Sequence, residues 1–515
     1  MSFWHLAPVQ KIQISDQIRA RIWTIQVYGL IVITFLSFFP TFFRFEEHLF
    51  FGLFAVALAL CWIEGKSPWV RSPIDLPLFL FVGWILFTVP FAIDPVYSFS
   101  EWRKLAAQVL LFYWVLLVLH QTTYPAMKAH SLGLEKGWRK GSGGGTPARR
   151  DYNQEHASRR SDSVPSPKPS VLVFPSPLAP PLSPKRVSDI GNPIEHHEVA
   201  QRQQILAKQS GFGHVGQTSR LTVIETILLA LVLGSSVLSA WSLVDFFERG
   251  GTWEDRIVRA NAPGSDYNWL GTYAIMALPL AVATGLVLLD YWQRLLSWLA
   301  CGLTLLALVF SYSRAAWLGA VVQVIVLALL FRRKALLVLV LIGIVALAAG
   351  LLVASLAGLQ QDTVDPWTWK SRMEVWSLGA HEIAKNPLTG LGYGYQTFEP
   401  LIADYPGGPS TVGLHSTILM VALGSGIPAI LLMLWILGQA FSQMVKYAVR
   451  AGIRGKGIIP LAVALMVFGF TVRNLFDYMF AGSLAYLFWI LAAVALAKAS
   501  QGMQTQARLV ATSKS

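Results

Sequence analysis

Residues 294–333 read RLLSWLACGLTLLALVFSYSRAAWLGAVVQVIVLALLFRR, two apolar runs joined at a short polar corner that contains Arg314. The runs, 294–311 and 314–332, each approach the length that an α-helix needs to cross a bilayer. Arg294 begins the first run, and Arg332 and Arg333 follow the second. The stretch therefore predicts a helical hairpin in a membrane, with Arg314 at the corner and the other basic residues at the opposite side.

The composition of the whole chain agrees with this hairpin. Of its 515 residues, 54% are hydrophobic and 13% are charged, and the mean hydropathy is +0.52. A soluble domain of this size could not bury so much apolar surface, so we expect an integral membrane protein. Cys61 and Cys301 both lie in apolar runs, which supports neither a disulfide framework nor a cysteine metal site.

Apolar runs of spanning length recur along the chain. The positive-inside rule places nearly all basic clusters on the cytoplasmic side when the number of crossings is even and both ends lie inside. We therefore predict an all-α polytopic membrane protein with about 12 transmembrane helices. The predicted spans lie near 22–41, 49–64, 77–93, 104–120, 221–243, 268–289, 294–311, 314–332, 334–358, 414–438, 457–474 and 479–498.

One long polar segment interrupts the spans. Residues 121–220 hold 14 Lys and Arg against 7 Asp and Glu, about half of the net charge of +13, and 137–190 are rich in Gly, Ser, Pro and Arg. We expect a disordered basic cytoplasmic insertion; docking or anionic-lipid tethering is the alternative to a simple solvated linker. Because the charge excess is concentrated there, it does not favour nucleic-acid binding. The predicted organisation is a four-span segment (1–120), the insertion, a membrane domain (221–498) and a cytoplasmic tail (499–515).

The predicted topology leaves two sizeable segments outside, 244–267 and 359–413. The second, between the ninth and tenth spans, is the larger, and we expect it to carry the chemistry. Met373, Trp376, Leu378 and Ile383 recur in it at roughly helical spacing, which predicts an amphipathic helix that ends before Pro387 and Gly390. The following GLGYGY resembles a phosphate loop, but no strand precedes it, so we interpret it as a turn.

Arg314 lies at the outer end of the eighth span, where the positive-inside rule disfavours it. Ser313 is a candidate N-cap, so that Arg314 would begin a helix whose N-terminal dipole and free backbone N–H groups favour an anion. The alternative is an arginine that extends to lipid headgroups.

Arg372 and His415 occupy the start and the end of the large outer segment. A second guanidinium could share a pyrophosphate with Arg314, because each offers a planar fork of donors that matches phosphate oxygens. His415 could act as a base, or it could be an interfacial or hydrogen-bonded structural residue.

Two further groups of polar residues belong to the same predicted outer face. Arg473 and Asp477 are best interpreted as a local ion pair or helix-end support. Glu46, Glu47 and His48 form an acidic cluster that could bind a metal, although adjacent carboxylates in a short loop are usually solvated.

Three stretches together resemble the O-antigen ligase/polymerase superfamily. They are SYSRAAWLG (311–319), SRMEVWSLGAHEIAKNPLTGLGYGYQTF (371–398) and the HS…GSGIPA pattern of 415–429. The resemblance covers roughly residues 220–480, whereas the four N-terminal spans resemble the family only in being membrane spans. Ala315 stands where the family usually has Gly, and Ala429 where its motif tends to end on Gly, Thr or Tyr; the insertion is not a family feature.

The resemblance implies a C-type membrane glycosyltransferase, metal-independent and inverting, in the bacterial inner membrane with its active site facing the periplasm. It implies that Arg314 and Arg372 hold the pyrophosphate of an undecaprenyl-pyrophosphate-linked glycan and that His415 activates the acceptor hydroxyl. Ser313, Ser416, Arg473 and Asp477 would support them, with neither metal nor cofactor. The expected partners are the glycan donor, lipid A-core or another glycan acceptor, and membrane lipids, but no nucleic acid.

Several activities share these residues. Ligation of a glycan onto lipid A-core is our first expectation, and an exopolysaccharide or O-antigen polymerase and a protein O-oligosaccharyltransferase are the alternatives within the superfamily. A bicarbonate-related transporter is the alternative that is not an enzyme. The sequence lacks the paired Gly/Pro-broken spans in corresponding halves that secondary transporters often show.

Overall fold

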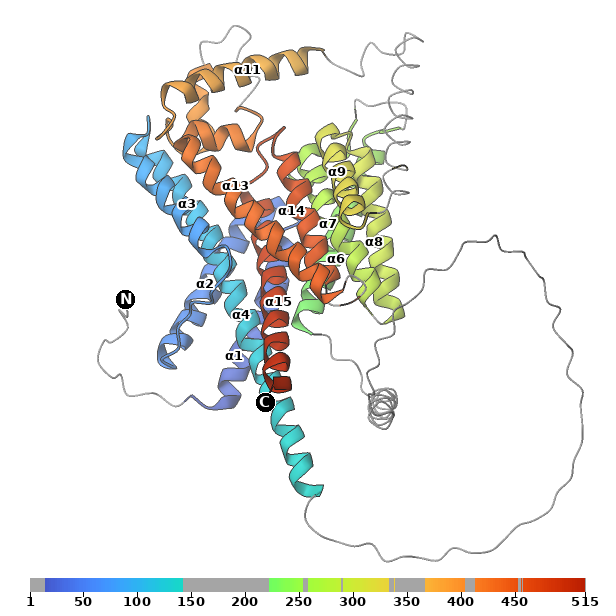
Figure 1. The fold of residues 1–515 in the computed structure, drawn as a ribbon. Helices are drawn as coiled ribbons and strands as arrows, with labels where there is room; N and C mark the ends of the chain where they lie inside the picture. Colours follow the sequence, from blue (N-terminus) through green and yellow to red (C-terminus); the bar gives the residue numbers. More distant parts are fainter. Residues whose placement is uncertain are drawn as a thin grey trace, which may run out of the picture. The chain divides into compact units, whose positions relative to one another are not determined.

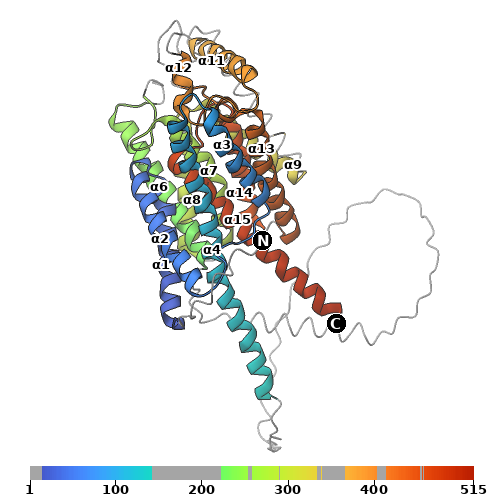
Figure 2. The same cartoon turned by 90° about the vertical axis from the view of Figure 1, so that its left-hand side faces the viewer.

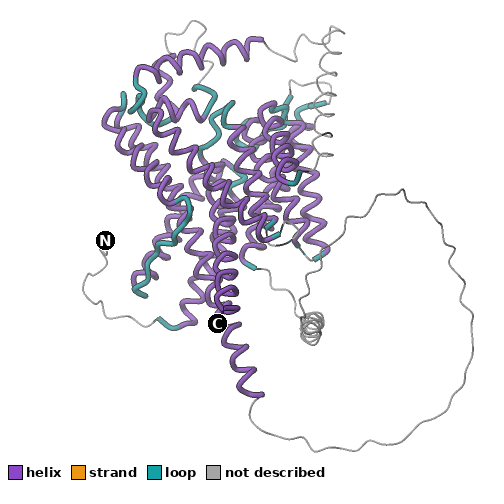
Figure 3. Tube along the Cα trace, in the orientation of Figure 1, coloured by secondary structure: helices purple, strands orange, loops and turns teal. Residues whose placement is uncertain are grey.

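The computed structural model describes residues 14–141, 222–252, 258–288, 290–332, 338, 366–402, 413–452, 455 and 457–514. Figure 3 shows that these residues form helices and connecting loops, with no strand among them. The predicted all-helical class is therefore confirmed for this part of the chain. Most of the predicted insertion and the predicted span at 334–358 lie outside the described residues.

Among the described residues, the N-terminal part (14–141) contains four α-helices and two short 3-10 helices, and Figure 1 shows the α-helices. Their bounds are α1 (Asp16–Leu36), η1 (Pro40–Phe42), α2 (Phe43–Ile63), α3 (Asp75–Thr88), η2 (Val89–Phe91) and α4 (Pro95–Gly141). The C-terminal part contains α6 (Val223–Glu248), α7 (Tyr267–Val287), α8 (Tyr291–Phe310), α9 (Arg314–Leu330), α11 (Pro366–Lys385), η3 (Tyr395–Phe398), α12 (Glu399–Ile402), α13 (Thr417–Ala451), α14 (Ile458–Arg473) and α15 (Gly482–Lys514).

Among the described residues, eight helices are long and apolar enough to cross a membrane: α1, α2 with η1, α4, α6, α7, α8, α13 and α15. Three shorter apolar helices, α3 with η2, α9 and α14, coincide with three more of the predicted spans. The chain is thus a multi-pass membrane protein. The total of twelve spans stays a prediction.

Two helices extend beyond their predicted ends. The predicted fourth span stops at residue 120, but α4 continues to Gly141, and α15 continues through the predicted tail to Lys514. Residues 121–141 of the predicted insertion thus lie in α4, and the disorder of the remainder stays a prediction. Once a membrane helix has formed, adding residues needs no new nucleation, so a polar continuation can remain helical.

The chain divides into two units, residues 1–129 with 221–515, and residues 130–220. Within the first unit α7 packs against α8 and α14, α6 against α8 and α1, and α13 against α3, α14 and α15. Of the eight long apolar helices, α15 is the most buried, because 89% of its apolar segment lies inside the protein. Helix α11 lies across one end of these helices in both views (Figures 1 and 2).

Helix α11 confirms the predicted amphipathic helix of the large outer segment. Val375, Leu378 and Ile383 pack on an apolar cluster that includes Leu414 and residues of α13. Met373 was assigned to this apolar face, but its side chain is 47% exposed. Helix α11 ends at Lys385, two residues before Pro387, as the sequence predicts.

A break in α13 joins this helix to the loop after α11. Ser425 and Gly426 have non-helical backbone angles, and Gly426 has φ of 78°. The groups freed by the break pair with loop 387–392: Leu391 N–H donates to the Leu423 carbonyl (2.7 Å), Gly392 N–H to the Gly424 carbonyl (2.9 Å), and Ile427 N–H to the Pro387 carbonyl (2.8 Å). The NPLTGLG and GSGIPA motifs therefore form one structural unit.

Gly426→Ala is expected to destabilise the protein. Its left-handed φ strains any residue with a Cβ, a cost of about 1–3 kcal/mol, and the added Cβ would collide with the Leu388 carbonyl. Gly438→Ala is the matched control in the same helix, because nothing lies within 4 Å of its added Cβ. Thermal unfolding in detergent should show a clear loss of stability for Gly426→Ala and no loss of stability for Gly438→Ala. Equal stabilities would contradict the described break.

Candidate functional site

A cavity of about 910 Å3 opens where the N-terminal and C-terminal parts meet. Its wall includes Phe43 of α2, one face of α4, the start of α7 and Arg372 of α11. The rest is formed by the loop around residues 393–396, by His415, and by the segment 477–482 that leads into α15. All these segments belong to the ends of helices or loops that the sequence places on one side of the membrane.

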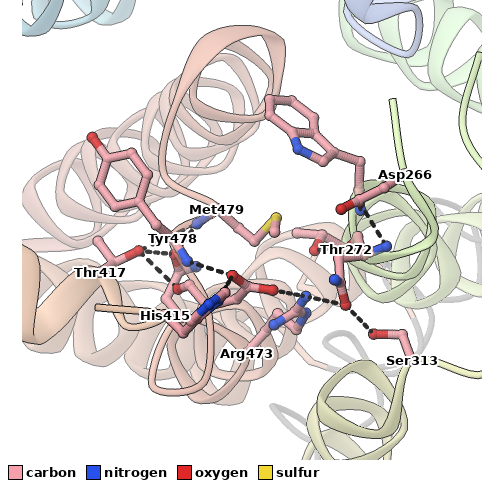
Figure 4. A network of polar contacts seen from close by, with 12 residues as sticks. Asp266, Thr272, Ser313, His415, Thr417, Arg473, Tyr478 and Met479 are labelled. Carbon is pink, nitrogen blue, oxygen red and sulfur yellow. Dashed lines mark hydrogen bonds and ion pairs between the residues drawn. The ribbon is translucent and has the colours of Figure 1, made fainter. Parts of the chain in front are cut away.

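A chain of polar contacts links the wall of this cavity to the start of α9 (Figure 4). Nδ1 of His415 lies 3.5 Å from Oδ1 of Asp477. Nη2 of Arg473 donates to Oδ2 of Asp477 at 3.1 Å and to Oδ1 of Asn268 at 3.0 Å. The Ser313 hydroxyl donates to the same Asn268 oxygen at 3.1 Å. Residues from four segments far apart in sequence are thereby held together.

His415 is held in an unusual backbone conformation immediately before α13. Its φ is 45°, in the left-handed region that non-glycine residues rarely adopt. The preceding Leu414 is fully buried, and its carbonyl accepts a hydrogen bond from Trp376 Nε1 at 2.8 Å. Ser416 caps α13 by accepting from Leu419 N–H at 3.4 Å. Such strain persists only where the surroundings determine the geometry, and it is common at functional sites.

Thr417 fixes the start of α13 to the segment that carries Asp477. Its N–H donates to the Asn474 and Asp477 carbonyls at 2.9 and 3.1 Å. Its hydroxyl donates to Oδ1 of Asn474 at 2.5 Å. The separation between His415 and Asp477 is therefore set by the backbone on both sides.

Arg473 is fully buried at the end of α14. Its Nη2 makes both hydrogen bonds described above, whereas Nε and Nη1 have no hydrogen-bond partner among the described residues. Its partner Asp477 lines the cavity, so Arg473 lies directly behind that part of the wall. The predicted ion pair of Arg473 with Asp477 is present.

Asp477 remains charged at ordinary pH despite its burial. Burial alone raises the pKa of this carboxyl, but the interaction with His415 and the charge of Arg473 together outweigh burial and lower the pKa from 3.8 to about 2. A charged Asp477 favours the His415 tautomer that carries its proton on Nδ1. Nε2 is then the nitrogen left to accept a proton.

The cavity is suited to an anion on the side of Arg372. Arg372 lines it, helices α7 and α15 begin in its wall at Tyr267 and Gly482, and α13 begins two residues after the lining residue His415. Helix N-termini carry partial positive charge and favour anions. Asp266 satisfies the first N–H groups of α7 by accepting from Asn268 and Trp269 at 2.9 and 3.0 Å, so α7 contributes least.

Arg314 begins α9, as the sequence predicts, but it does not line this cavity. Its side chain is exposed, and it makes no hydrogen bond or ion pair with the residues that the structure describes. Ser313 occupies the N-cap position, yet its hydroxyl makes no capping bond and donates to Asn268 instead. The predicted N-cap position of Ser313 is confirmed, although its side chain accepts no capping hydrogen bond. The following segment, 333–337, lies outside the described residues.

The predicted acidic cluster of Glu46, Glu47 and His48 does not form one site in the structure. These residues lie in the first turns of α2 rather than in a short loop, so Glu46 faces inward and is fully buried. Its carboxylate accepts from the Ser37 hydroxyl at 3.3 Å, while His48 is exposed. Across the described part of the chain, no group of three or more His, Cys, Asp or Glu side chains is arranged to hold a metal ion.

Sequence reasoning missed the contribution of α4 and the start of α7. Glu101, Lys104 and Gln108 line the cavity from α4, and Asn268 lines it from α7. A signal was present, because these α4 residues are polar, spaced by three or four, and lie at the start of an otherwise apolar predicted span. Asn268 had no such local signal, because its importance comes from partners in α9 and α14.

Asp477→Asn is expected to lower the free energy of unfolding by about 3 kcal/mol at neutral pH, because it leaves Arg473 as an unpaired buried cation. Since folding lowers this pKa, the stabilisation by the Asp477 carboxylate, about 2 kcal/mol, is complete above about pH 4 and disappears as pH falls towards 2.

Denaturant unfolding in detergent at several pH values would test this expectation. The difference in the free energy of unfolding between the parent and Asp477→Asn should shrink as the pH falls from about 4 towards 2. Asp16→Asn is the control, because Asp16 also pairs with an arginine but is 95% exposed. A pH-independent difference would contradict the proposed charge state.

Comparison with known proteins identifies the family that part of the chain resembles. No curated protein matches the chain. Residues 299–434 match the family model described as O-Antigen ligase, a narrower region than the 220–480 suggested by the sequence. The matched segment contains Arg314, Arg372 and His415 but neither Asn268, Asp477 nor α4. It confirms the resemblance: residues 299–434 of the chain are similar to the O-antigen ligase family.

Proposed function

We propose that the protein transfers a glycan from an undecaprenyl-pyrophosphate carrier to an acceptor hydroxyl, in the manner of an O-antigen ligase at the periplasmic face of the inner membrane. The observation that carries this proposal is the joint presence of Arg372 and His415 in one cavity, within a segment that matches the O-antigen ligase family. The apolar helices around the cavity suit a donor with a lipid tail.

In the proposed reaction, the acceptor oxygen attacks C1 of the donor sugar while the bond from C1 to the pyrophosphate oxygen breaks. The lipid pyrophosphate leaves with both electrons of that bond. Nε2 of His415 takes the proton of the attacking hydroxyl and later releases it to water. Asp477, 3.5 Å from Nδ1, stabilises the imidazolium formed in between.

The cations beside the cavity would stabilise the leaving group. Arg372 offers a planar fork to the phosphate oxygens, and the buried Arg473 adds positive potential behind it. Preorganised charges of this kind are usually the largest contribution to such catalysis. We retain Arg314 as the second pyrophosphate ligand by analogy with the family, with its guanidinium reaching the phosphate once the donor is bound. Because arginines neutralise the leaving group, we propose a metal-independent reaction.

The direct test supplies the purified full-length protein in lipid nanodiscs with undecaprenyl-pyrophosphate-linked glycan and lipid A-core. We expect release of undecaprenyl pyrophosphate and transfer of the whole glycan to lipid A-core, detected by mass spectrometry and unaffected by EDTA. Lengthening of the donor glycan instead would identify a polymerase. Absence of both products with a well-folded protein would contradict the proposal, and inhibition by EDTA that a divalent cation reverses would contradict metal independence.

Arg372→Ala is expected to lower the transfer rate by about 10²-fold or more, because one fork of donors to the leaving group is lost. Arg372→Lys should restore only part, since an ammonium keeps the charge but not the paired donors. Arg314→Ala should behave like Arg372→Ala. Lys370→Ala is the control, an exposed cation of the same helix outside the cavity. Full activity of the lysine variant would argue against bidentate pyrophosphate binding.

His415→Ala should lower transfer by about 10²–10⁴-fold, the usual contribution of a general base. Transfer by the parent should also fall as the medium is acidified, because a protonated imidazole cannot accept a proton. His381→Ala, which alters an exposed histidine of α11, should leave the rate and its pH profile unchanged. A His415→Ala enzyme with the parental rate and pH profile would exclude His415 as the base.

A further inference from the structure

Helix α4 presents a row of side chains to the cavity that the proposed chemistry does not use. Tyr97, Glu101, Lys104 and Gln108 all line it, and their spacing of three or four residues places them on one face of the helix. They belong to a different wall from Arg372 and His415, in the N-terminal part of the chain and outside the segment that matches the family model.

Gln108 is the deepest member of this row and the least satisfied. Its side chain is only 7% exposed, and its carboxamide makes no hydrogen bond with the residues that the structure describes. The buried polar atoms that lack a partner do not include those of the Gln108 amide, so this amide faces the cavity, where a ligand can exchange hydrogen bonds with it. Since Gln108 lines the cavity, a ligand that both donates and accepts hydrogen bonds would satisfy it.

The other residues of this row on α4 are polar and carry no net charge. Nζ of Lys104 donates to Oε1 of Glu101 at 2.5 Å, so the two charges compensate each other. The Tyr97 hydroxyl accepts from Gln396 N–H at 3.0 Å, which fixes its position. Gly394 allows this close approach, because a Cβ there would lie 2.6 Å from both Glu101 and Tyr97. A paired carboxylate favours a neutral ligand over a pyrophosphate.

Aromatic rings complete this side of the cavity. Tyr393, Tyr395 and Tyr478 line it, and the rings of Tyr395 and Tyr478 are 5.2 Å apart. Tyrosines combine an apolar face with a hydroxyl. Sugar rings have the matching features, C–H faces and hydroxyls that both donate and accept. Apolar walls with a few fixed polar groups are typical of small-molecule sites.

We infer that the α4 wall, formed by Tyr97, Glu101, Lys104 and Gln108, binds a neutral sugar ring of the acceptor and holds its hydroxyl towards His415. The inference rests on the proposed function and adds where the acceptor binds. The donor's first sugar is bonded to the pyrophosphate, which keeps it beside Arg372. The acceptor must approach C1 from elsewhere, and the neutral, hydrogen-bonding wall is suited to it.

Gln108→Leu tests the inference, because it removes both hydrogen-bonding groups and retains a side chain of similar size. Transfer is measured in nanodiscs with undecaprenyl-pyrophosphate-linked glycan as donor and lipid A-core as acceptor, each varied in turn. We expect the KM for lipid A-core to rise about tenfold, as for one lost hydrogen-bonding group, with the donor KM unchanged. Arg103→Ala, on α4 but outside the cavity, should change neither constant.

The outcomes separate this inference from the proposed function. No transfer by the parent would refute the function itself. Transfer by the parent with an unchanged acceptor KM in Gln108→Leu, or a rise in the donor KM instead, would overturn only the acceptor site. Thermal unfolding shows whether the variant is folded; if it is not, Glu101→Gln takes its place, with the same rise in acceptor KM expected and the same results counting against the inference.

Discussion

The buried ion pair of Arg473 with Asp477 is the interaction on which the rest of the site depends. Arg473 has no exposed surface, and a cation at such depth costs several kcal/mol unless it is paired. Its partners are therefore fixed by necessity: Asp477 on one side and Asn268 on the other. Through Asp477 the pair orients His415, and through Asn268 it holds Ser313 at the start of α9. One desolvated guanidinium thus positions residues from α7, α9, α13 and α14.

The second constraint is the broken helix α13. Its break at Ser425 and Gly426 frees backbone groups, several of which pair with loop 387–392. The side chains of Trp84 and Thr88 in α3 bond with Ser425 as well, at 2.9 and 3.1 Å. The loop, in turn, leads directly into Tyr393 and Tyr395 on the cavity wall. Two sequence motifs with 31 residues between them (393–423) therefore act as one support for the cavity.

Much of this arrangement follows from the sequence, and the remainder shows where local patterns are insufficient. The lengths of the apolar runs located the spans and the positive-inside rule gave their topology, and the large predicted outer segment directed attention to Arg372 and His415, which share the cavity. Asn268 was missed because a residue at the start of an apolar run gives no indication of its tertiary partners, whereas the polar residues of α4 had a signal in their spacing of three or four. Glu46 was misplaced because the start of α2 was taken for a loop. The continuation of α4 beyond residue 120 was missed because helical propagation needs less apolar character than membrane insertion does.

The most direct test of the central claim is the position of the donor pyrophosphate. A cryo-EM structure of His415→Ala in nanodiscs with undecaprenyl-pyrophosphate-linked glycan bound would retain the donor without turnover. The account predicts phosphate oxygens within hydrogen-bond distance of the Arg372 guanidinium, with C1 of the first sugar between Arg372 and position 415. A pyrophosphate bound away from this cavity, or contacted by a metal ion in place of the guanidinium, would contradict it.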